Sequence, residues 1–137
     1  MIQTAKEIMH QHTYVPADMS VREVAEIMSR KKIGSVLIKT KDGLGILTER
    51  DITNKVVLKA LDPNGVKAEE IMTSPVVTIE GKTDLYEICR IFNENRFRRL
   101  PVVEKGDVIG ILTTRDVVKQ FIPRFFKEMY HFKDFRF

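Results

Sequence analysis

The sequence contains no tryptophan, a single cysteine, three histidines and no long hydrophobic run. One cysteine cannot form a disulfide within the chain, which excludes a small domain held together by disulfides. The longest apolar stretches are a few residues, as at 36–38, whereas a helix that crosses a bilayer needs about 20. We therefore expect a protein that does not span a membrane.

The few reactive side chains do not form a recognisable chemical site. Cys89 falls on the apolar face of a predicted helix, which is typical of a buried thiol. His10 and His12 are near the N-terminus and His131 is in the C-terminal tail, so no metal-ligand spacing emerges. The N-terminus lacks the apolar core of a secretory signal, and together with the lone cysteine this favours a cytoplasmic protein.

Length and composition fit one ordinary globular domain. The chain has 137 residues, of which 43% are hydrophobic and 31% charged. Its net charge is +4 and its pI about 9.2, which would suit an anionic partner. Acidic and basic residues alternate along most of the chain, however, so charge alone favours a solvated surface.

An internal repeat dominates the sequence. The segment 45–51, Gly-Ile-Leu-Thr-Glu-Arg-Asp, recurs at 110–116 as Gly-Ile-Leu-Thr-Thr-Arg-Asp, with a single change. In the same alignment, Glu-Ile-Met at 7–9 matches Glu-Ile-Met at 70–72. Repetition of this kind predicts two copies of one supersecondary unit.

Each copy is predicted to contain a short helical lead-in ending in Ile-Met, a strand, an amphipathic helix, two strands and a second helix. Ser20 begins a capping-box pattern before the first amphipathic helix, and Asp84 takes the same place in the second copy. The apolar stripes of these helices are Val21, Val24, Ala25, Ile27 and Met28, then Leu85, Ile88, Cys89, Ile91 and Phe92.

Two short apolar runs follow each amphipathic helix, at 35–38 and 44–47 and again at 100–103 and 108–112. Asp42-Gly43 and Gly106-Asp107 are predicted to turn the chain between them. We expect an α/β fold in which two small sheets pack together about a pseudo-twofold axis, with flanking helices and a cleft. The predicted domains are repeat 1 (1–66), repeat 2 (67–123) and a helical tail (124–137), and a linker spans 61–66.

The order of elements, the two Gly-Ile-Leu-Thr-x-Arg-Asp segments and the run Arg-Arg-Leu-Pro-Val-Val at 98–103 resemble the cystathionine β-synthase (CBS) domain family. The resemblance covers roughly residues 4–122. It implies a tandem pair of CBS repeats. Residues 33–37 of the first copy are one residue shorter than 97–102 of the second, which suggests that two binding sites would not be equivalent.

Thr48 with Asp51, and Thr113 with Asp116, match the spacing of a helix N-cap and its capping-box partner. Each pair also follows a strand, which places its carboxylate at the carboxyl end of a sheet, where α/β clefts lie. A carboxylate and a hydroxyl so placed suit the two hydroxyls of a ribose. The resemblance nominates both pairs as ribose ligands, and capping and ligand binding can coexist.

The resemblance also suggests neighbours for the other parts of a nucleotide. Candidate phosphate ligands are arginines: Arg98, Arg99, Arg115 and Arg50. Because residues alternate along a strand, only one of the adjacent pair Arg98 and Arg99 is expected to face the ligand. Plausible adenine neighbours are Gly34, Ser35, Leu100 and Pro101.

The predicted function is a non-catalytic sensor that binds an adenine nucleotide (AMP, ADP or ATP) or S-adenosylmethionine as a regulatory ligand. No nucleophile with a base, metal set or glycine-rich phosphate loop is visible in the sequence. The Asp116 site is expected to be the stronger, since Arg98 and Arg99 lie in its repeat. The resemblance further implies a homodimer, and the signal would pass to an effector protein encoded elsewhere or to the tail.

Two alternatives remain. One is a protein-interaction scaffold without a ligand. The other is nucleic-acid binding by the basic, aromatic tail, in which aromatic and cationic residues alternate. Helical spacing in the tail instead favours a helix that packs on its own domain or on a second subunit, and the residues with this spacing are Phe121, Phe125, Met129 and Phe132.

Overall fold

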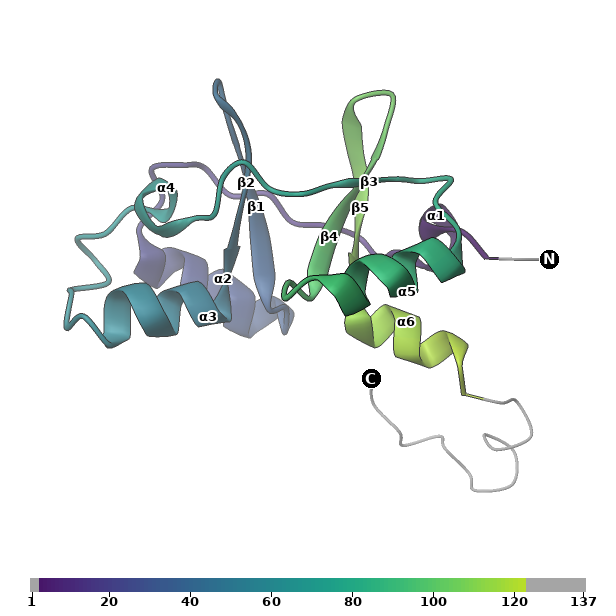
Figure 1. Cartoon of the computed structure of the whole chain (residues 1–137). Coiled ribbons are helices and arrows are strands. Elements are labelled where there is room, and N and C mark those ends of the chain that lie inside the picture. Colours follow the sequence, from purple (N-terminus) through teal and green to yellow (C-terminus); the bar gives the residue numbers. More distant parts are fainter. Residues whose placement is uncertain (1–2, 123–137) are drawn as a thin grey trace. The chain divides into compact units, whose positions relative to one another are not determined.

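The computed structural model describes residues 3–122, so the tail predicted at 124–137 lies outside the described residues. The described residues confirm a mixed α/β fold (Figure 1). The elements in chain order are α1 (Ala5–Ile8), α2 (Val21–Lys31), β1 (Ser35–Thr40), β2 (Gly43–Thr48), α3 (Glu49–Ile52), the π-helical segment η1 (Thr53–Val57), α4 (Ala68–Ile71), β3 (Ile79–Glu80), α5 (Leu85–Glu94), β4 (Arg99–Glu104), β5 (Asp107–Thr113) and α6 (Thr114–Gln120).

The chain divides into two compact units. One unit is His12–Val76, and the other joins the N-terminal segment up to Gln11 to the chain from Val77 onward. Helix α1 contacts β5, and α4 contacts β2. Each lead-in helix therefore packs on the sheet of the other sequence repeat.

A close contact between a methionine and a glycine fixes each lead-in segment. The Met9 sulfur lies against Gly110, and the Met72 sulfur lies against Gly45, where any side chain on the glycine would overlap it. Beside the first contact, the backbones of His10 and Ile111 exchange two hydrogen bonds of 3.0 and 2.9 Å. Glycine is required here because only a residue without Cβ allows so close an approach.

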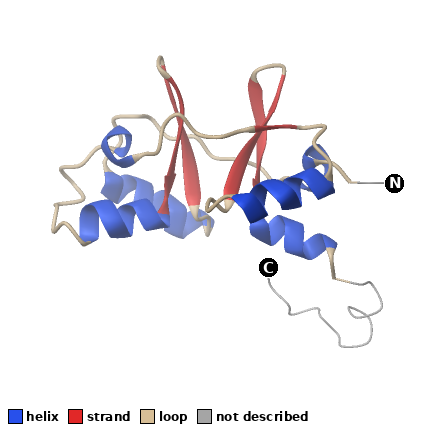
Figure 2. Cartoon of the chain, in the orientation of Figure 1, coloured by secondary structure: helices blue, strands red, loops and turns tan. Residues whose placement is uncertain are grey.

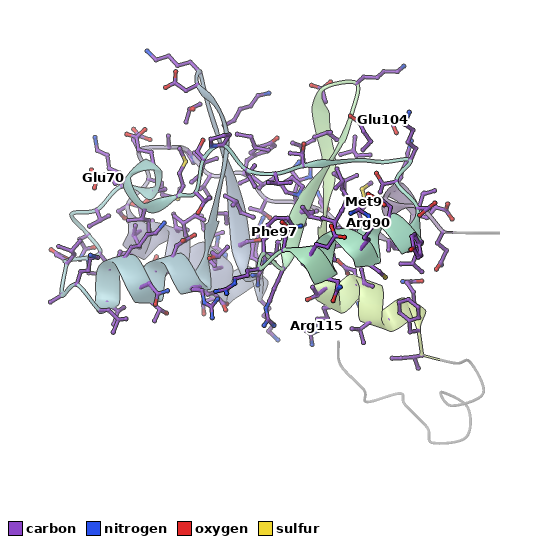
Figure 3. The ribbon with its side chains drawn as sticks, viewed as in Figure 1. Met9, Glu70, Arg90, Phe97, Glu104 and Arg115 are labelled. Carbon is purple, nitrogen blue, oxygen red and sulfur yellow. The ribbon has the colours of Figure 1, made fainter. Side chains whose placement is uncertain are left out.

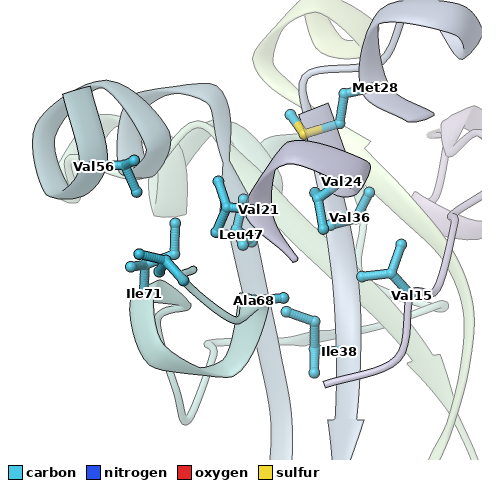
Figure 4. Close-up of a cluster of buried hydrophobic side chains, with 11 residues drawn as sticks. Val15, Val21, Val24, Met28, Val36, Ile38, Leu47, Val56, Ala68 and Ile71 are labelled. Carbon is cyan, nitrogen blue, oxygen red and sulfur yellow. The ribbon is translucent and has the colours of Figure 1, made fainter. Parts of the chain in front are cut away.

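The unit formed by His12–Val76 is built on the antiparallel β1–β2 hairpin, with Ser35 opposite Thr48. The strand predicted before α2 is reduced to one bridge between Tyr14 and Leu37. Pro16 follows, and because proline has no N–H it cannot extend the pairing. Figure 2 shows helices α2, α3 and α4 gathered around this hairpin. Its core (Figure 4) consists of Val15, Val21, Val24, Met28, Val36, Ile38, Leu47, Val56, Val66, Ala68 and Ile71.

The other unit has a three-stranded sheet in the order β3-β4-β5. Strand β3 is parallel to β4, and β4 is antiparallel to β5. The turn falls at Lys105 and Gly106, one residue earlier than predicted, and their φ angles of 53° and 83° suit a type I′ turn. The buried core comprises Ala5, Ile8, Ile79, Ile88, Leu100, Val102, Leu112 and Val117.

Both amphipathic helices begin where the capping pattern predicts. Ser20 Oγ accepts from the Glu23 N–H at 3.2 Å, and Asp84 Oδ1 accepts from the Glu87 N–H at 2.9 Å. Cys89 was predicted to be buried, but it is only half-buried at the edge of the core. Over residues 3–122, no helix is long and apolar enough to cross a membrane.

We predict that Gly110→Ala destabilises the protein more than Gly45→Ala. A Cβ at 110 would lie 2.9 Å from the backbone oxygen of His10, whereas at 45 it meets only the flexible side chain of Met72. Overpacking of this kind costs about 1–3 kcal/mol. Urea unfolding measures both changes, and Gly65→Ala, where the nearest atom is 3.6 Å away, is the control. Equal losses at 45 and 110 would contradict this account.

Candidate functional site

The two Thr-x-x-Asp segments form matching loops at the ends of β2 and β5. In the first, the Thr48 N–H and hydroxyl donate to Asp51 Oδ2 at 2.9 and 3.1 Å, and the Asp51 N–H donates to Thr48 Oγ1 at 3.2 Å. In the second, Thr113 and Asp116 make the same three bonds at 2.8, 3.0 and 3.2 Å. Both pairs are therefore capping boxes, as the spacing predicts.

The capping bonds set the direction of each carboxylate. Thr48 and Thr113 keep extended backbone angles as the chain leaves the strand, and the helix begins at the next residue. Asp51 and Asp116 then lie in the first turn, where a negative charge is favourable. Each carboxylate is held through Oδ2, and its second oxygen, Oδ1, is left for other partners.

The start of the neighbouring strand lies beside each loop: β1 beside the first loop and β4 beside the second. Ser35 lies opposite Thr48, and the Glu49 N–H donates to the Gly34 oxygen at 3.1 Å. In the other unit, Arg99 lies opposite Thr113, and the Thr114 N–H donates to the oxygen of Arg98, again at 3.1 Å. The structure thus brings the predicted residues 34 and 35 to the first loop, and 98 and 99 to the second.

Leu100 and Pro101 differ from the other predicted adenine neighbours. Both are almost fully buried, and Leu100 is part of the hydrophobic core. Gly34 and Ser35 are half-buried at the edge of their unit. Adenine contact by these four residues stays a prediction.

Two of the four predicted phosphate ligands, Arg50 and Arg115, lie within the loop segments, and Arg98 and Arg99 lie at the start of the strand paired with the second loop. Arg50 and Arg115 project from the first turns of α3 and α6 and are exposed, and Figure 3 shows Arg115 extending into solvent. Arg98 is exposed and Arg99 is half-buried. Within residues 3–122, no carboxylate lies within 4.0 Å of any of these four guanidinium groups.

Each carboxylate also has a nitrogen-bearing neighbour that the sequence did not nominate, a lysine in the first loop and a histidine in the second. Lys55 Nζ lies 3.1 Å from Asp51 Oδ1, and His10 Nδ1 lies 2.8 Å from Asp116 Oδ2. The spacing of four residues between Asp51 and Lys55 on one helix could have revealed the first contact. His10 comes from the distant lead-in segment, so no local pattern points to it.

Among residues 3–122, Asp116 is the one charged residue that is buried, with only 8% of its surface exposed. Burial raises the pKa of its carboxyl group, but the hydrogen bonds from His10 and Thr113 lower it, and the net pKa is below the usual value. The carboxylate is thus ionised at neutral pH. No cluster of three or more His, Cys, Asp or Glu side chains that could hold a metal occurs between residues 3 and 122.

Comparison with known proteins identifies the repeats. The model of the CBS domain family matches residues 5–58 and 68–122. An uncharacterized protein of Methanopyrus kandleri is 37% identical over 107 residues, which cover 76% of this chain and 54% of that protein. Hypoxic response protein 1 of Mycobacterium tuberculosis is 29% identical over 119 residues, covering 85% of this chain and 83% of that one. The chain spans between a third and two thirds of the length of the first three curated relatives.

Solved structures agree with this assignment. A protein from Pyrococcus horikoshii has a TM-score of 0.82 and 28% identity, covering 90% of this chain and 96% of its own. The hexameric CBS-CP12 protein from bloom-forming cyanobacteria has a TM-score of 0.80 and 28% identity, covering 95% and 81%.

We predict that Asp116 contributes to acid-dependent stability. Because its folded-state pKa is lowered, its contribution is fully present above the unfolded-state pKa of about 3.9 and is lost as pH falls through the folded-state value. The stability difference between wild type and Asp116→Asn should therefore shrink as pH falls from 5 to 2.5. Urea unfolding at a series of pH values measures it, and a difference that stays constant over this range would refute the prediction.

Proposed function

Because this chain belongs to the CBS domain family and carries two such domains, we propose that it is a regulatory module that binds an adenine nucleotide at its Thr-x-x-Asp loops. The observation that carries the proposal is the pair of matching loops, in which a hydroxyl and an oriented carboxylate lie beside arginines that have no ion-pair partner among residues 3–122. The expected ligands are AMP, ADP and ATP, with S-adenosylmethionine as a further candidate.

The ribose is the part of the ligand that the loops suit best. Its 2′- and 3′-hydroxyls are hydrogen-bond donors, and an ionised carboxylate is an acceptor only. Asp51 and Asp116 each have one oxygen fixed by the capping bonds, which orients the other without loss of side-chain freedom on binding. Hydrogen bonds to an ionised group are stronger than those between neutral groups.

The arginines supply the charge that a phosphate requires. Arg98, Arg99 and Arg115 lie beside the second loop, and Arg50 lies beside the first. A guanidinium group binds phosphate oxygens through two parallel N–H donors, which favours arginine over lysine at such a site. The second loop therefore has the larger share of positive charge. We propose Gly34 and Ser35 as adenine neighbours for the first loop, and Leu100 and Pro101 as adenine neighbours for the second.

The proposed role is to sense the ligand rather than to change it chemically. A bound nucleotide shifts an equilibrium between two conformations only by its differential affinity for them. The output would pass to a partner protein or to another copy of the chain. The first three curated relatives are matched over only part of their own length, so their remaining parts do not bear on the effector proposed for this chain.

Self-association is part of the proposal, with a homodimer as the expected state. Large apolar side chains are exposed in both units: Val57 (65%) and Leu58 (73%) on and after η1, and Tyr86 (75%), Val118 (51%) and Phe121 (62%) on and after α5 and α6. Exposed apolar groups of this kind mark interaction surfaces. The structurally similar cyanobacterial CBS-CP12 protein is hexameric.

We predict that an adenine nucleotide raises the thermal unfolding temperature. A ligand at about 100 times its dissociation constant stabilises the folded state by about 2.7 kcal/mol. The protein is heated with AMP, ADP, ATP, S-adenosylmethionine or a short single-stranded oligonucleotide, after any carried-over ligand has been removed. Asp116→Ala should reduce the shift more than Asp51→Ala, and the double variant should abolish it.

Other outcomes of this experiment separate the alternatives. A shift with the oligonucleotide alone would favour a nucleic-acid-binding protein. No shift with any compound would favour a scaffold that binds proteins. Equal or reversed losses in the two single variants would overturn the ranking of the loops while leaving nucleotide binding intact.

We predict that Leu58→Asp and Val118→Asp reduce the oligomeric state without unfolding the protein, because each places a charge on an exposed apolar surface. Light scattering coupled to size exclusion measures the mass. Lys59→Asp, on an exposed residue adjacent to Leu58, is the matched control. If both variants keep the wild-type mass, these surfaces do not mediate self-association.

A further inference from the structure

We propose that Lys55 occupies the carboxylate oxygen of the first Thr-x-x-Asp loop, Asp51 Oδ1, that the two hydroxyls of a ribose would otherwise bind. In the second loop the equivalent oxygen, Asp116 Oδ1, stays available to them. The inference rests on the proposed function and goes beyond it, because it assigns the difference between the two loops to one side chain. Lys55 would then be a residue that sets which loop binds a ribose more tightly.

In the first loop, both carboxylate oxygens already have partners, one through hydrogen bonds and the other through an ion pair. Asp51 Oδ2 is held by the N–H and hydroxyl of Thr48, and Oδ1 lies 3.1 Å from Lys55 Nζ. The same ammonium group donates to the backbone oxygen of Ile71 at 2.9 Å. Lys55 is therefore anchored at two points and half-buried, unlike a lysine that moves freely in solvent.

The second loop distributes its bonds differently. Asp116 Oδ2 accepts all three: from the Thr113 N–H at 2.8 Å, from its hydroxyl at 3.0 Å, and a bond with His10 Nδ1 at 2.8 Å. Among residues 3–122, no donor reaches Asp116 Oδ1. This oxygen is thus available to a ligand hydroxyl, and His10 helps to hold the carboxylate in the orientation that presents it.

The residue equivalent to Lys55 in the second loop is Gln120, four positions after Asp116 as Lys55 is four after Asp51. The Gln120 side chain donates to the backbone oxygen of Asp116 at 3.2 Å and leaves the carboxylate alone. A single difference in side-chain chemistry at matching positions therefore accounts for the occupied and the open oxygen.

The backbone around Lys55 also differs from its counterpart. Lys55 lies in the π-helical segment η1, where the Leu58 N–H donates to the Thr53 oxygen at 2.9 Å, whereas Gln120 ends a regular α-helix. Single π-turns within helices occur often at functional sites. Lys55 thus lies in this wider π-helical turn, and its ammonium group lies between the Asp51 carboxylate and the backbone oxygen of Ile71, the last residue of α4.

A diol that enters the first loop must displace a charged donor, and at the second it meets a free acceptor. The test uses the full chain with AMP as the probe and isothermal titration calorimetry as the readout. In an Asp116→Ala background only the first loop remains. Adding Lys55→Gln, which reproduces the residue of the second loop, should tighten binding about twofold, since one ion pair is removed.

Lys59→Gln in the same background is the control, because it removes the same charge from an exposed position nearby. The reciprocal change, Gln120→Lys in an Asp51→Ala background, should weaken binding at the second loop by a similar factor. Thermal unfolding of each variant shows that it is folded.

Unchanged AMP binding in Lys55→Gln would overturn the inference while leaving the proposed function in place. Weaker binding would overturn it too, because Lys55 would then contact the ligand directly. If neither the wild type nor any variant binds AMP, ADP or ATP, the proposed function itself fails, and this inference fails with it.

Discussion

The approach of a methionine to a glycine is the contact on which the rest of the structure depends. Met9 against Gly110, and Met72 against Gly45, attach each lead-in segment to the strand that ends in a Thr-x-x-Asp loop. Because this strand belongs to the other sequence repeat, the sequence repeats exchange their lead-in helices, and each compact unit holds the lead-in of one repeat with the strands of the other. The same attachment brings His10 to Asp116. A side chain at Gly110 would also meet the backbone of His10 and push the lead-in away from the strand.

The two loops show how one local design can give two different electrostatic environments. Their capping bonds are the same, because these bonds involve only the threonine and the aspartate of the loop itself. The side chains beside them differ, because Lys55 comes from the following helix and His10 from a distant segment. The shared bonds fix where each carboxylate lies, and the neighbours decide which of its oxygens is free. The proposed nucleotide binding and the proposed difference between the loops thus depend on separate sets of contacts.

Local patterns in the sequence predicted most of the fold. The caps at Ser20 and Asp84, the apolar stripes and the Thr-x-x-Asp capping boxes all depend on residues three or four apart, and the structure confirms them. Long-range contacts could not be predicted in this way: the packing of α1 on β5 and the bond between His10 and Asp116 join residues about a hundred positions apart. The turn after β4 was misplaced by one residue because Lys105, which has no turn preference, adopts a positive φ there. The roles of the arginines and of residues 34, 35, 100 and 101 stay predictions.

The central claim is that the loop carboxylates bind the hydroxyls of a ribose. It is tested most directly by titrating the wild-type protein with AMP and with its 2′,3′-dideoxy analogue, which keeps the adenine and the phosphate and lacks only the two hydroxyls. The account predicts that the analogue binds about tenfold more weakly or worse, because its binding would leave a desolvated carboxylate oxygen without a donor. Equal affinity for the two compounds would contradict it, and would show that Asp51 and Asp116 serve only as helix caps.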